Sequence, residues 1–216
     1  MNNCYLDAEA VITFFRMTGR KHIFITGSRG SGKSHLVNNM LKHMSDSFNL
    51  LQSHRTDTPQ VVIKSNLVAD NKEFVIGVPR TSGINPASKG NNMTIIEDGF
   101  INCAIPAIDT HLDTTPERLF VIDELGYLES SCIPFQKAVE KLLDNSHVLA
   151  VIRKQSTEFL NRICNRKDVL VIDIDNTFET LSCIIMASGM SKRFGSNKLI
   201  TDFNGCLLYT SPSPRD

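Results

Sequence analysis

The sequence has no hydrophobic run long enough to cross a membrane, and its first residues do not predict a secretory leader. No stretch of its 216 residues approaches the roughly 18 consecutive apolar residues that a spanning helix needs. Residues 1–20 carry Asp7 and Glu9 where a signal peptide would be basic, and they contain no small-residue cleavage site. We therefore expect a cytoplasmic protein with no membrane partner.

The cysteines form no metal-binding pattern, and the charge has no excess of either sign. None of the six cysteines belongs to a C-x-x-C pair, so we expect reduced thiols. Lys plus Arg number 23, as do Asp plus Glu, which argues against a dedicated nucleic-acid partner because such proteins need a basic field. With 41% hydrophobic and 21% charged residues, the composition excludes disordered, collagen-like and coiled-coil proteins.

Short apolar runs alternate with amphipathic segments along most of the chain. The runs that predict strands are 23–25, 61–63, 74–78, 93–96, 119–122, 148–152 and 169–172. The segments that predict helices are 7–17 (followed by Gly19 as a helix stop), 33–44, 106–111, one that begins at Pro134, and 156–164. Residues 79–90 predict a long loop. The alternation predicts an α/β fold with three layers, in which helices cover both faces of a mainly parallel sheet.

Residues 27–34, just after the first predicted strand, match the pattern G-x-x-x-x-G-K-[ST] in full. They are Gly27, Ser28, Arg29, Gly30, Ser31, Gly32, Lys33 and Ser34. Glycines let the backbone curl so that successive N–H groups hold phosphate oxygens, and the helix that follows directs its positive end at the same oxygens. Lys33 is expected to bridge the β- and γ-phosphates, and the Ser34 hydroxyl to bind Mg²⁺. We interpret the segment as a phosphate-binding loop (P-loop) for a nucleoside triphosphate.

The predicted strand 119–122 runs directly into Asp123 and Glu124. In P-loop proteins an acidic residue at such a position holds Mg²⁺, which is the role that we expect for Asp123. Glu124 is placed to polarise a water molecule in line with the γ-phosphate. The alternative is a surface Asp-Glu pair at the end of a strand, which the upstream P-loop disfavours.

Residues 123–129 read Asp-Glu-Leu-Gly-Tyr-Leu-Glu. Together with the helix that contains Phe135 and the strand 148–152, they resemble the D-E-[IL]-G-x-[ML]-E signature of small P-loop nucleoside-triphosphatases, which are known from thermophiles and from animals. The resemblance covers about residues 20–175. It implies slow Mg²⁺-dependent hydrolysis of ATP, GTP and other triphosphates, with Lys33, Asp123 and Glu124 as catalytic residues. Arg29 and Arg153 are candidates for stabilising charge on the γ-phosphate.

A second apolar run and glycine-containing loop occupy residues 183–199. They resemble the first residues of molybdenum-cofactor cytidylyltransferases, and the matching positions are Gly189, Ser191, Arg193, Gly195 and Lys198. Residues 206–216 resemble a translated library adapter. We therefore expect a P-loop domain over 1–176, a linker over 177–181, a catalytically inactive fragment of a second α/β domain over 182–205, a non-native tail over 206–216, and a longer natural protein.

Three functions remain open at this point. The first is a nucleoside-triphosphatase. The second is a small-molecule kinase, although the dispersed Arg153, Arg162 and Arg166 do not form the arginine-rich lid typical of such enzymes. The third is a nucleotide-dependent switch that regulates a partner in molybdenum-enzyme maturation. Phosphate release without an acceptor favours the first, and release that requires an acceptor favours the second.

Overall fold

The computed structural model describes residues 7–44, 47–80, 93–176, 202–203 and 206–207. The chain divides into two units, Met1–Thr180 and Leu181–Asp216. Strands of the first unit are β1 (His22–Gly27), β2 (Phe48–Arg55), β3 (Val61–Ser65), β4 (Phe74–Pro79), β5 (Met93–Ile95), β6 (Leu119–Leu125), β7 (His147–Arg153) and β8 (Val169–Asp173). Its helices are α1 (Ala8–Thr18), α2 (Lys33–Met44), α3 (Glu97–Gly99), α4 (Ile105–Thr114), α5 (Ile133–Asn145) and α6 (Glu158–Cys164), with short helical turns η1 (Ala69–Asn71), η2 (Phe100–Ala104) and η3 (Glu129–Ser131).

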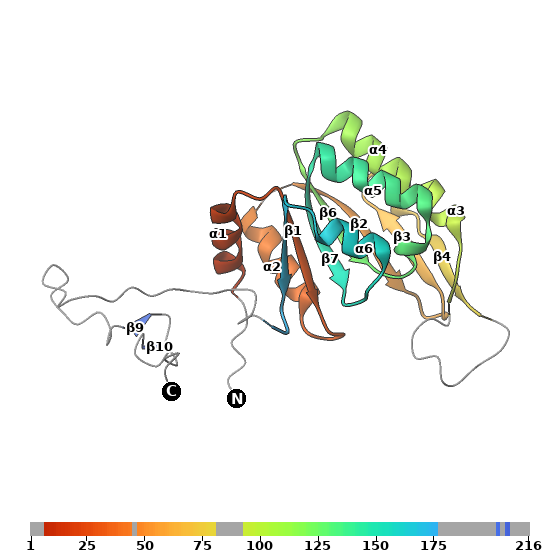
Figure 1. Cartoon of the computed structure of the whole chain (residues 1–216). Coiled ribbons are helices and arrows are strands. Elements are labelled where there is room, and N and C mark those ends of the chain that lie inside the picture. Colours follow the sequence, from red (N-terminus) through yellow and green to blue (C-terminus); the bar gives the residue numbers. More distant parts are fainter. Residues whose placement is uncertain (1–6, 45–46, 81–92, 177–201, 204–205, 208–216) are drawn as a thin grey trace, which may run out of the picture. The chain divides into compact units, whose positions relative to one another are not determined.

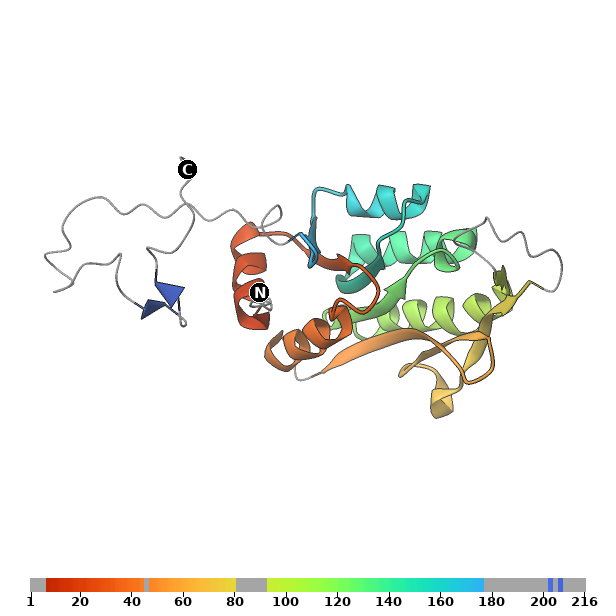
Figure 2. The same ribbon diagram turned by 90° about the horizontal axis from the view of Figure 1, so that it is seen from below.

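The eight strands form one sheet in the order β5-β4-β3-β2-β6-β7-β1-β8. β2, β6, β7, β1 and β8 are parallel, with β1 paired to both β7 and β8. Helices α1 and α2 cover one face of the sheet, and α4, α5 and α6 cover the other (Figures 1 and 2). The three-layer α/β fold with a mostly parallel sheet is therefore confirmed.

The parallel strands read as continuous apolar runs because both of their faces are buried. Along β7, Val148, Ala150 and Ile152 join the hydrophobic cluster beneath α4, α5 and α6. The alternate residues Leu149 and Val151 join the cluster beneath α1 and α2. This period of two follows from the pleat of a strand, which directs successive side chains to opposite faces. The phosphate-loop strand β1 thus lies inside the core rather than at an edge.

Antiparallel strands extend the sheet beyond β2. The pairs β2–β3, β3–β4 and β4–β5 are all antiparallel. Buried residues of this extension, such as Ile63 and Ile76, belong to the cluster under α4 and α5 and not to the cluster under α1 and α2. β2 was not predicted, because five of its eight residues are polar and it shows no regular alternation. It is nevertheless the strand that joins the parallel and antiparallel parts.

The helical backbone before α4 begins earlier than predicted. α4 has Pro106 in its first turn, as expected, but α3 and the π-helical turn η2 precede it without a break from Glu97. Pro106 has no N–H and its ring crowds the carbonyl one turn back, so the wider π-helical turn accommodates it within a continuous helical segment. Elsewhere Gly19 ends α1 with φ +64°, as predicted for a helix stop.

A buried polar network fixes β2 against the helical layer. The Asn49 amide donates to His111 Nδ1 and to Thr115 Oγ1, both at 2.8 Å. Ser146 Oγ donates to the Pro116 carbonyl at 2.8 Å, so it accepts from His111 Nε2 at 2.7 Å. His111 is therefore neutral with its proton on Nε2, in agreement with burial that lowers its pKa.

Several predictions concern residues outside the described ranges. They include most of the predicted loop 79–90 and the whole second glycine loop, with Gly189, Ser191, Arg193, Gly195 and Lys198. In the second unit, β9 (Asp202–Phe203) and β10 (Cys206–Leu207) form an antiparallel pair. The domain boundaries and the non-native tail stay predictions. Among the described helices, none is long and apolar enough to cross a membrane.

His22, at the start of β1, is fully buried, and neither ring nitrogen has a hydrogen-bond partner among the residues that the structure describes. Its Nε2 lies 3.4 Å from Asp168 Oδ2. Burial lowers the pKa of His22 to about 4, against a smaller opposing effect of the Asp168 charge. The unfolded chain therefore takes up the proton first as the pH falls, and folded-state stability is lost between about pH 6.5 and pH 4.

We expect the burial of His22 to account for a measurable part of the stability that the folded chain loses at acid pH. Between pH 7.5 and pH 5, the free energy of unfolding of the native chain is expected to fall by about 2 kcal/mol more than that of His22→Leu, which has a similar volume and no ionisable group. Urea unfolding at the two pH values measures the difference. Equal losses in the two proteins contradict the assignment.

Candidate active site

The P-loop residues lie between β1 and α2, at the carboxyl end of the parallel strands. Gly30 and Gly32 have φ values of +77° and +90°. Only glycine adopts such values without strain, which explains glycine at these two positions. The Leu36 N–H donates to the Gly32 carbonyl at 3.0 Å, so the first turn of α2 begins directly at the end of the loop. The amino end of α2, with its unpaired N–H groups, therefore faces the space that the loop encloses.

The Lys33 ammonium is folded into the curl of its own loop. Its Nζ donates to the carbonyl oxygens of Gly27 at 3.0 Å and Ser28 at 2.7 Å. These contacts hold the positive charge among the exposed residues of the loop, where an anion can replace the carbonyl partners. Ser34 is exposed on the first turn of α2. The structure therefore places the two predicted phosphate and metal ligands on one short stretch of backbone.

The segment just after β8 contacts the P-loop, and this contact was not predicted from the sequence. Asp175 accepts hydrogen bonds from Ser28 N at 2.6 Å and from Ser28 Oγ at 2.9 Å. Lys154 forms ion pairs with Asp173 at 2.8 Å and Asp175 at 3.2 Å. The only sequence signal was the presence of two acids after the last predicted strand, and it did not indicate a partner.

Asp123 and Glu124 lie at the carboxyl end of β6 and have different partners. In the pairing with β7, Asp123 faces Val151 and Leu125 faces Ile152, so Glu124 is the extra residue of a β-bulge. Asp123 is half-buried and accepts from Gln52 Nε2 at 3.3 Å. Burial is the main cause that raises the pKa of Asp123, while the Gln52 hydrogen bond and the Lys33 charge oppose it.

Glu124 forms an ion pair with Arg153, whose Nε lies 2.5 Å from Glu124 Oε1. The backbone of Glu124 is held from β2, since Ser53 Oγ lies 3.4 Å from the Glu124 carbonyl oxygen. Ser53 Oγ also donates to Glu129 Oε1 at 3.2 Å, and Glu129 Oε2 accepts from Gly126 N at 3.0 Å. Glu129 is buried, which raises its pKa. The last acid of the 123–129 signature thus positions the turn that carries Glu124.

A cavity of about 770 Å³ lies over the P-loop. Besides P-loop residues 27–34, the residues that line it are His35, Arg55, Glu124, Arg153, Lys154 and Gln155. The structure therefore brings all eight predicted P-loop residues, Glu124, and both candidate arginines, Arg29 and Arg153, to one space. Asp123 does not line it and contacts Gln52 instead. The volume is in the range of natural ligand sites.

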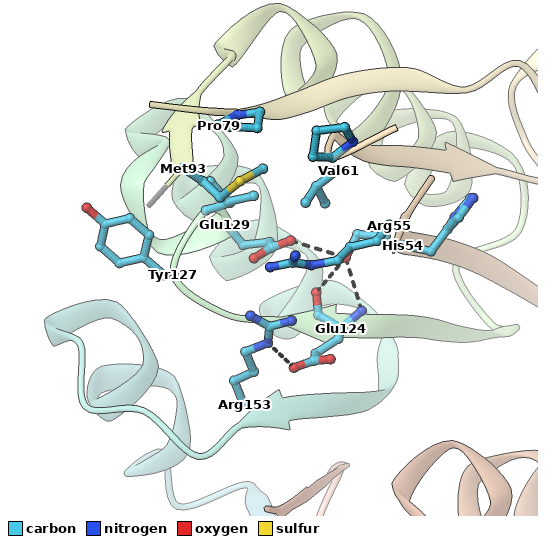
Figure 3. A pocket seen from close by; sticks show the side chains of 12 residues that line it. His54, Arg55, Val61, Pro79, Met93, Glu124, Tyr127, Glu129 and Arg153 are labelled. Atoms are coloured by element: carbon cyan, nitrogen blue, oxygen red, sulfur yellow. Dashed lines mark hydrogen bonds and ion pairs between the residues drawn. The ribbon is translucent and has the colours of Figure 1, made fainter. Parts of the chain in front are cut away.

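A second cavity, of about 440 Å³, adjoins the first and shares Arg55, Glu124 and Arg153 with it. Figure 3 shows Val61, Pro79 and Met93 along one wall and the Glu124–Arg153 pair on the opposite side. Arg55 extends into the space between them (Figure 3). Sequence reasoning missed Gln52, Ser53 and Arg55 because β2 itself was not predicted.

Fold and site together define the class of P-loop nucleotide-binding proteins with an α/β sheet. A model of the NTPase family matches residues 22–182, and the chain belongs to this family. The match includes the P-loop, both acids of β6 and the strands β7 and β8.

Curated and solved relatives agree with this assignment. The chain is 26% identical over 155 residues to nucleoside-triphosphatase THEP1 of Thermotoga sp. (strain RQ2), which covers 71% of this chain and 86% of that protein. It is 23% identical over 154 residues to the Thermotoga maritima THEP1, with the same coverage. The crystal structure of THEP1 from Aquifex aeolicus matches with a TM-score of 0.57 and 18% identity, over 72% of this chain and 91% of that chain. The solution structure of a human cancer-related nucleoside triphosphatase matches with a TM-score of 0.53 and 19% identity, over 74% and 92%.

Proposed function

We propose that this chain hydrolyses nucleoside triphosphates to the diphosphate and phosphate in the cavity over the P-loop. The observation that carries the proposal is that one cavity is lined by the complete P-loop and by Glu124. Family membership and the THEP1 relatives, which are named as nucleoside-triphosphatases, support the same reaction.

Some residues of the cavity bind the triphosphate, and Glu124 assists the attack of water on it. Backbone N–H groups of the P-loop and the amino end of α2 hold the phosphate oxygens, apart from the Ser28 N–H, which donates to Asp175. The Lys33 ammonium leaves its two carbonyl partners and pairs with the β- and γ-phosphates. Glu124, which lines the same cavity, orients the attacking water and accepts its proton.

The donor set fits a magnesium ion. Two oxygen ligands of the kind that Mg²⁺ prefers are the Ser34 hydroxyl, which lines the cavity, and the Asp123 carboxylate, which precedes the lining residue Glu124 in the chain. Asp123 is a carboxylate whose burial is offset only in part by Gln52 and Lys33, and a divalent cation would offset it further. Bound there with the substrate, Mg²⁺ would neutralise charge on the phosphate oxygens.

The test is phosphate release from ATP, GTP, CTP and UTP without any second substrate. We expect steady release with Mg²⁺ and a fall to the no-enzyme background when excess EDTA removes the ion, with full recovery when Mg²⁺ is restored. A coupled phosphate assay measures both. Release that is insensitive to EDTA contradicts the magnesium proposal, and no release from any triphosphate contradicts the hydrolase proposal.

Three finer parts of the proposal depend on other evidence. A link to nucleotidyl transfer in molybdenum-cofactor maturation rests on residues 183–199, which lie outside the described residues. A partner protein in that process, and hence the regulatory-switch alternative, rests on the same segment. A cytoplasmic location rests on the sequence. All three stay predictions.

A further inference from the structure

We propose that the second cavity binds a phosphoryl acceptor, a small molecule that carries a hydroxyl group and an aromatic ring, and that the chain transfers the γ-phosphoryl group to it. The inference rests on the proposed function, because it needs a triphosphate in the P-loop. In this view, hydrolysis is what the site does when water takes the place of the acceptor.

The position of the second cavity is the first argument. Glu124 lines both cavities, and so does Arg153, its ion-pair partner. A residue that activates the nucleophile for in-line displacement lies on the side of the γ-phosphate that faces away from the leaving diphosphate. We therefore place the nucleophile in the second cavity, which reaches the same carboxylate. A hydroxyl group held there meets the same carboxylate as the hydrolytic water.

The walls of the second cavity are the second argument. A cavity that serves only to admit water needs neither depth nor apolar surface. This one measures about 440 Å³ and has an apolar part formed by Val61, Met93 and Leu128, with the Tyr127 ring beside them. Polar side chains, among them His54 and Arg55, line the rest of the cavity. Ligand sites combine apolar walls with polar groups that fix the orientation of the ligand. The apolar part fits a ring, and the polar end at Glu124 fits the hydroxyl.

The third argument is the pairing of the charged residues that line the second cavity. The two carboxylates of the cavity are already engaged, Glu124 by Arg153 and Glu129 by hydrogen bonds from Ser53 and Gly126. Arg55 lines both cavities, and within the part of the chain that the structure describes it forms no ion pair. Its guanidinium is thus available to the phosphoryl group as that group passes from one cavity to the other. A cation at this position stabilises the transferred charge.

The reaction balances without a further reactant. The acceptor oxygen forms a bond to the γ-phosphorus, and the bond from that phosphorus to the β,γ-bridging oxygen breaks. The acceptor hydroxyl proton passes to Glu124 and then to solvent. The products are a nucleoside diphosphate and the phosphate ester of the acceptor.

The experiment follows the label of [γ-³²P]ATP in the presence of Mg²⁺ and one probe at a time. The probes are the four ribonucleosides, thiamine and pyridoxine, which all combine a ring with a hydroxyl, and glycerol, which has no ring. Chromatography separates labelled ester from labelled phosphate. We expect ester from at least one ring-containing probe and little from glycerol.

Two variants locate the transfer. Val61→Phe fills the apolar part, and Tyr127→Ala removes its aromatic side, so each is expected to lower the ratio of ester to phosphate by about tenfold. Val78→Phe is the matched control, because Val78 lies on β4 and lines neither cavity. It is expected to leave the ratio unchanged.

Either of two results overturns the inference while the hydrolase proposal stands. One is phosphate release with no labelled ester from any ring-containing probe. The other is ester formation whose ratio to phosphate is the same in Val61→Phe, Tyr127→Ala and the native chain, since the acceptor then binds elsewhere. Absence of both phosphate and ester is a different result and removes the proposed function itself.

Discussion

Lys33→Ala is expected to lower kcat/KM for ATP by about 10³-fold, because the variant loses the cation that stabilises charge on the β- and γ-phosphates in the transition state. Among the described residues, the ammonium bonds only to carbonyl oxygens of its own loop, Gly27 and Ser28, so it is available to the substrate. Part of the loss is expected as weaker binding of ATP, since the charge contacts the ground state as well. Phosphate release as a function of ATP concentration separates kcat from KM.

The control for this variant is Lys137→Ala. Lys137 is exposed on α5, which covers the opposite face of the sheet from α2, and alanine is a good helix former at such a position. We expect its kinetics to equal those of the native chain. If Lys33→Ala keeps more than about a tenth of the native kcat/KM, the P-loop is not the site of hydrolysis.

Glu124→Gln is expected to lower kcat by about 10²- to 10⁴-fold, which is the usual contribution of a positioned general base. Glutamine has nearly the same shape but does not accept the proton. It also ends the ion pair with Arg153, which leaves that guanidinium free beside the phosphates. ATP binding is therefore expected to be retained or to become tighter, in contrast to Lys33→Ala.

Titration with a fluorescent ATP analogue measures the binding of this variant, and single-turnover phosphate release measures its chemical step. Glu9→Gln is the matched control, because Glu9 is exposed in the first turn of α1, away from the residues that line either cavity. Equal kcat values for Glu124→Gln and the native chain contradict the general-base role. A loss confined to binding contradicts it as well.

The two variants test residues that local sequence patterns predicted. The P-loop is recognisable because its chemistry depends on consecutive residues: two glycines with positive φ, a lysine and a hydroxyl on one short stretch. The same holds for Asp123 and Glu124, which follow a buried strand directly. Even so, the pairing with β7 shows that Glu124 sits in a bulge, and no pattern in residues 119–124 indicated it.

The residues that hold the P-loop and Glu124 in position could not be predicted from local sequence patterns. Ser53 and Glu129 are 76 residues apart and meet only because β2 pairs with β6. Asp175 and Ser28 are 147 residues apart and meet because β8 pairs with β1. Such contacts depend on the order of strands in the sheet, and a single sequence carries no signal for which distant segments become neighbours.

Short-range physics explains what could be established from the order of residues alone. Side-chain period, glycine conformations and helix ends depend on neighbours within a few positions, and they predicted the α/β class, the P-loop and the acidic end of β6. Strand order, the antiparallel extension and the second cavity depend on long-range pairing, which is decided by burial of whole faces against one another. Folding thereby brings Arg55, from a strand that no local pattern predicted, to the boundary between the phosphate cavity and its neighbour.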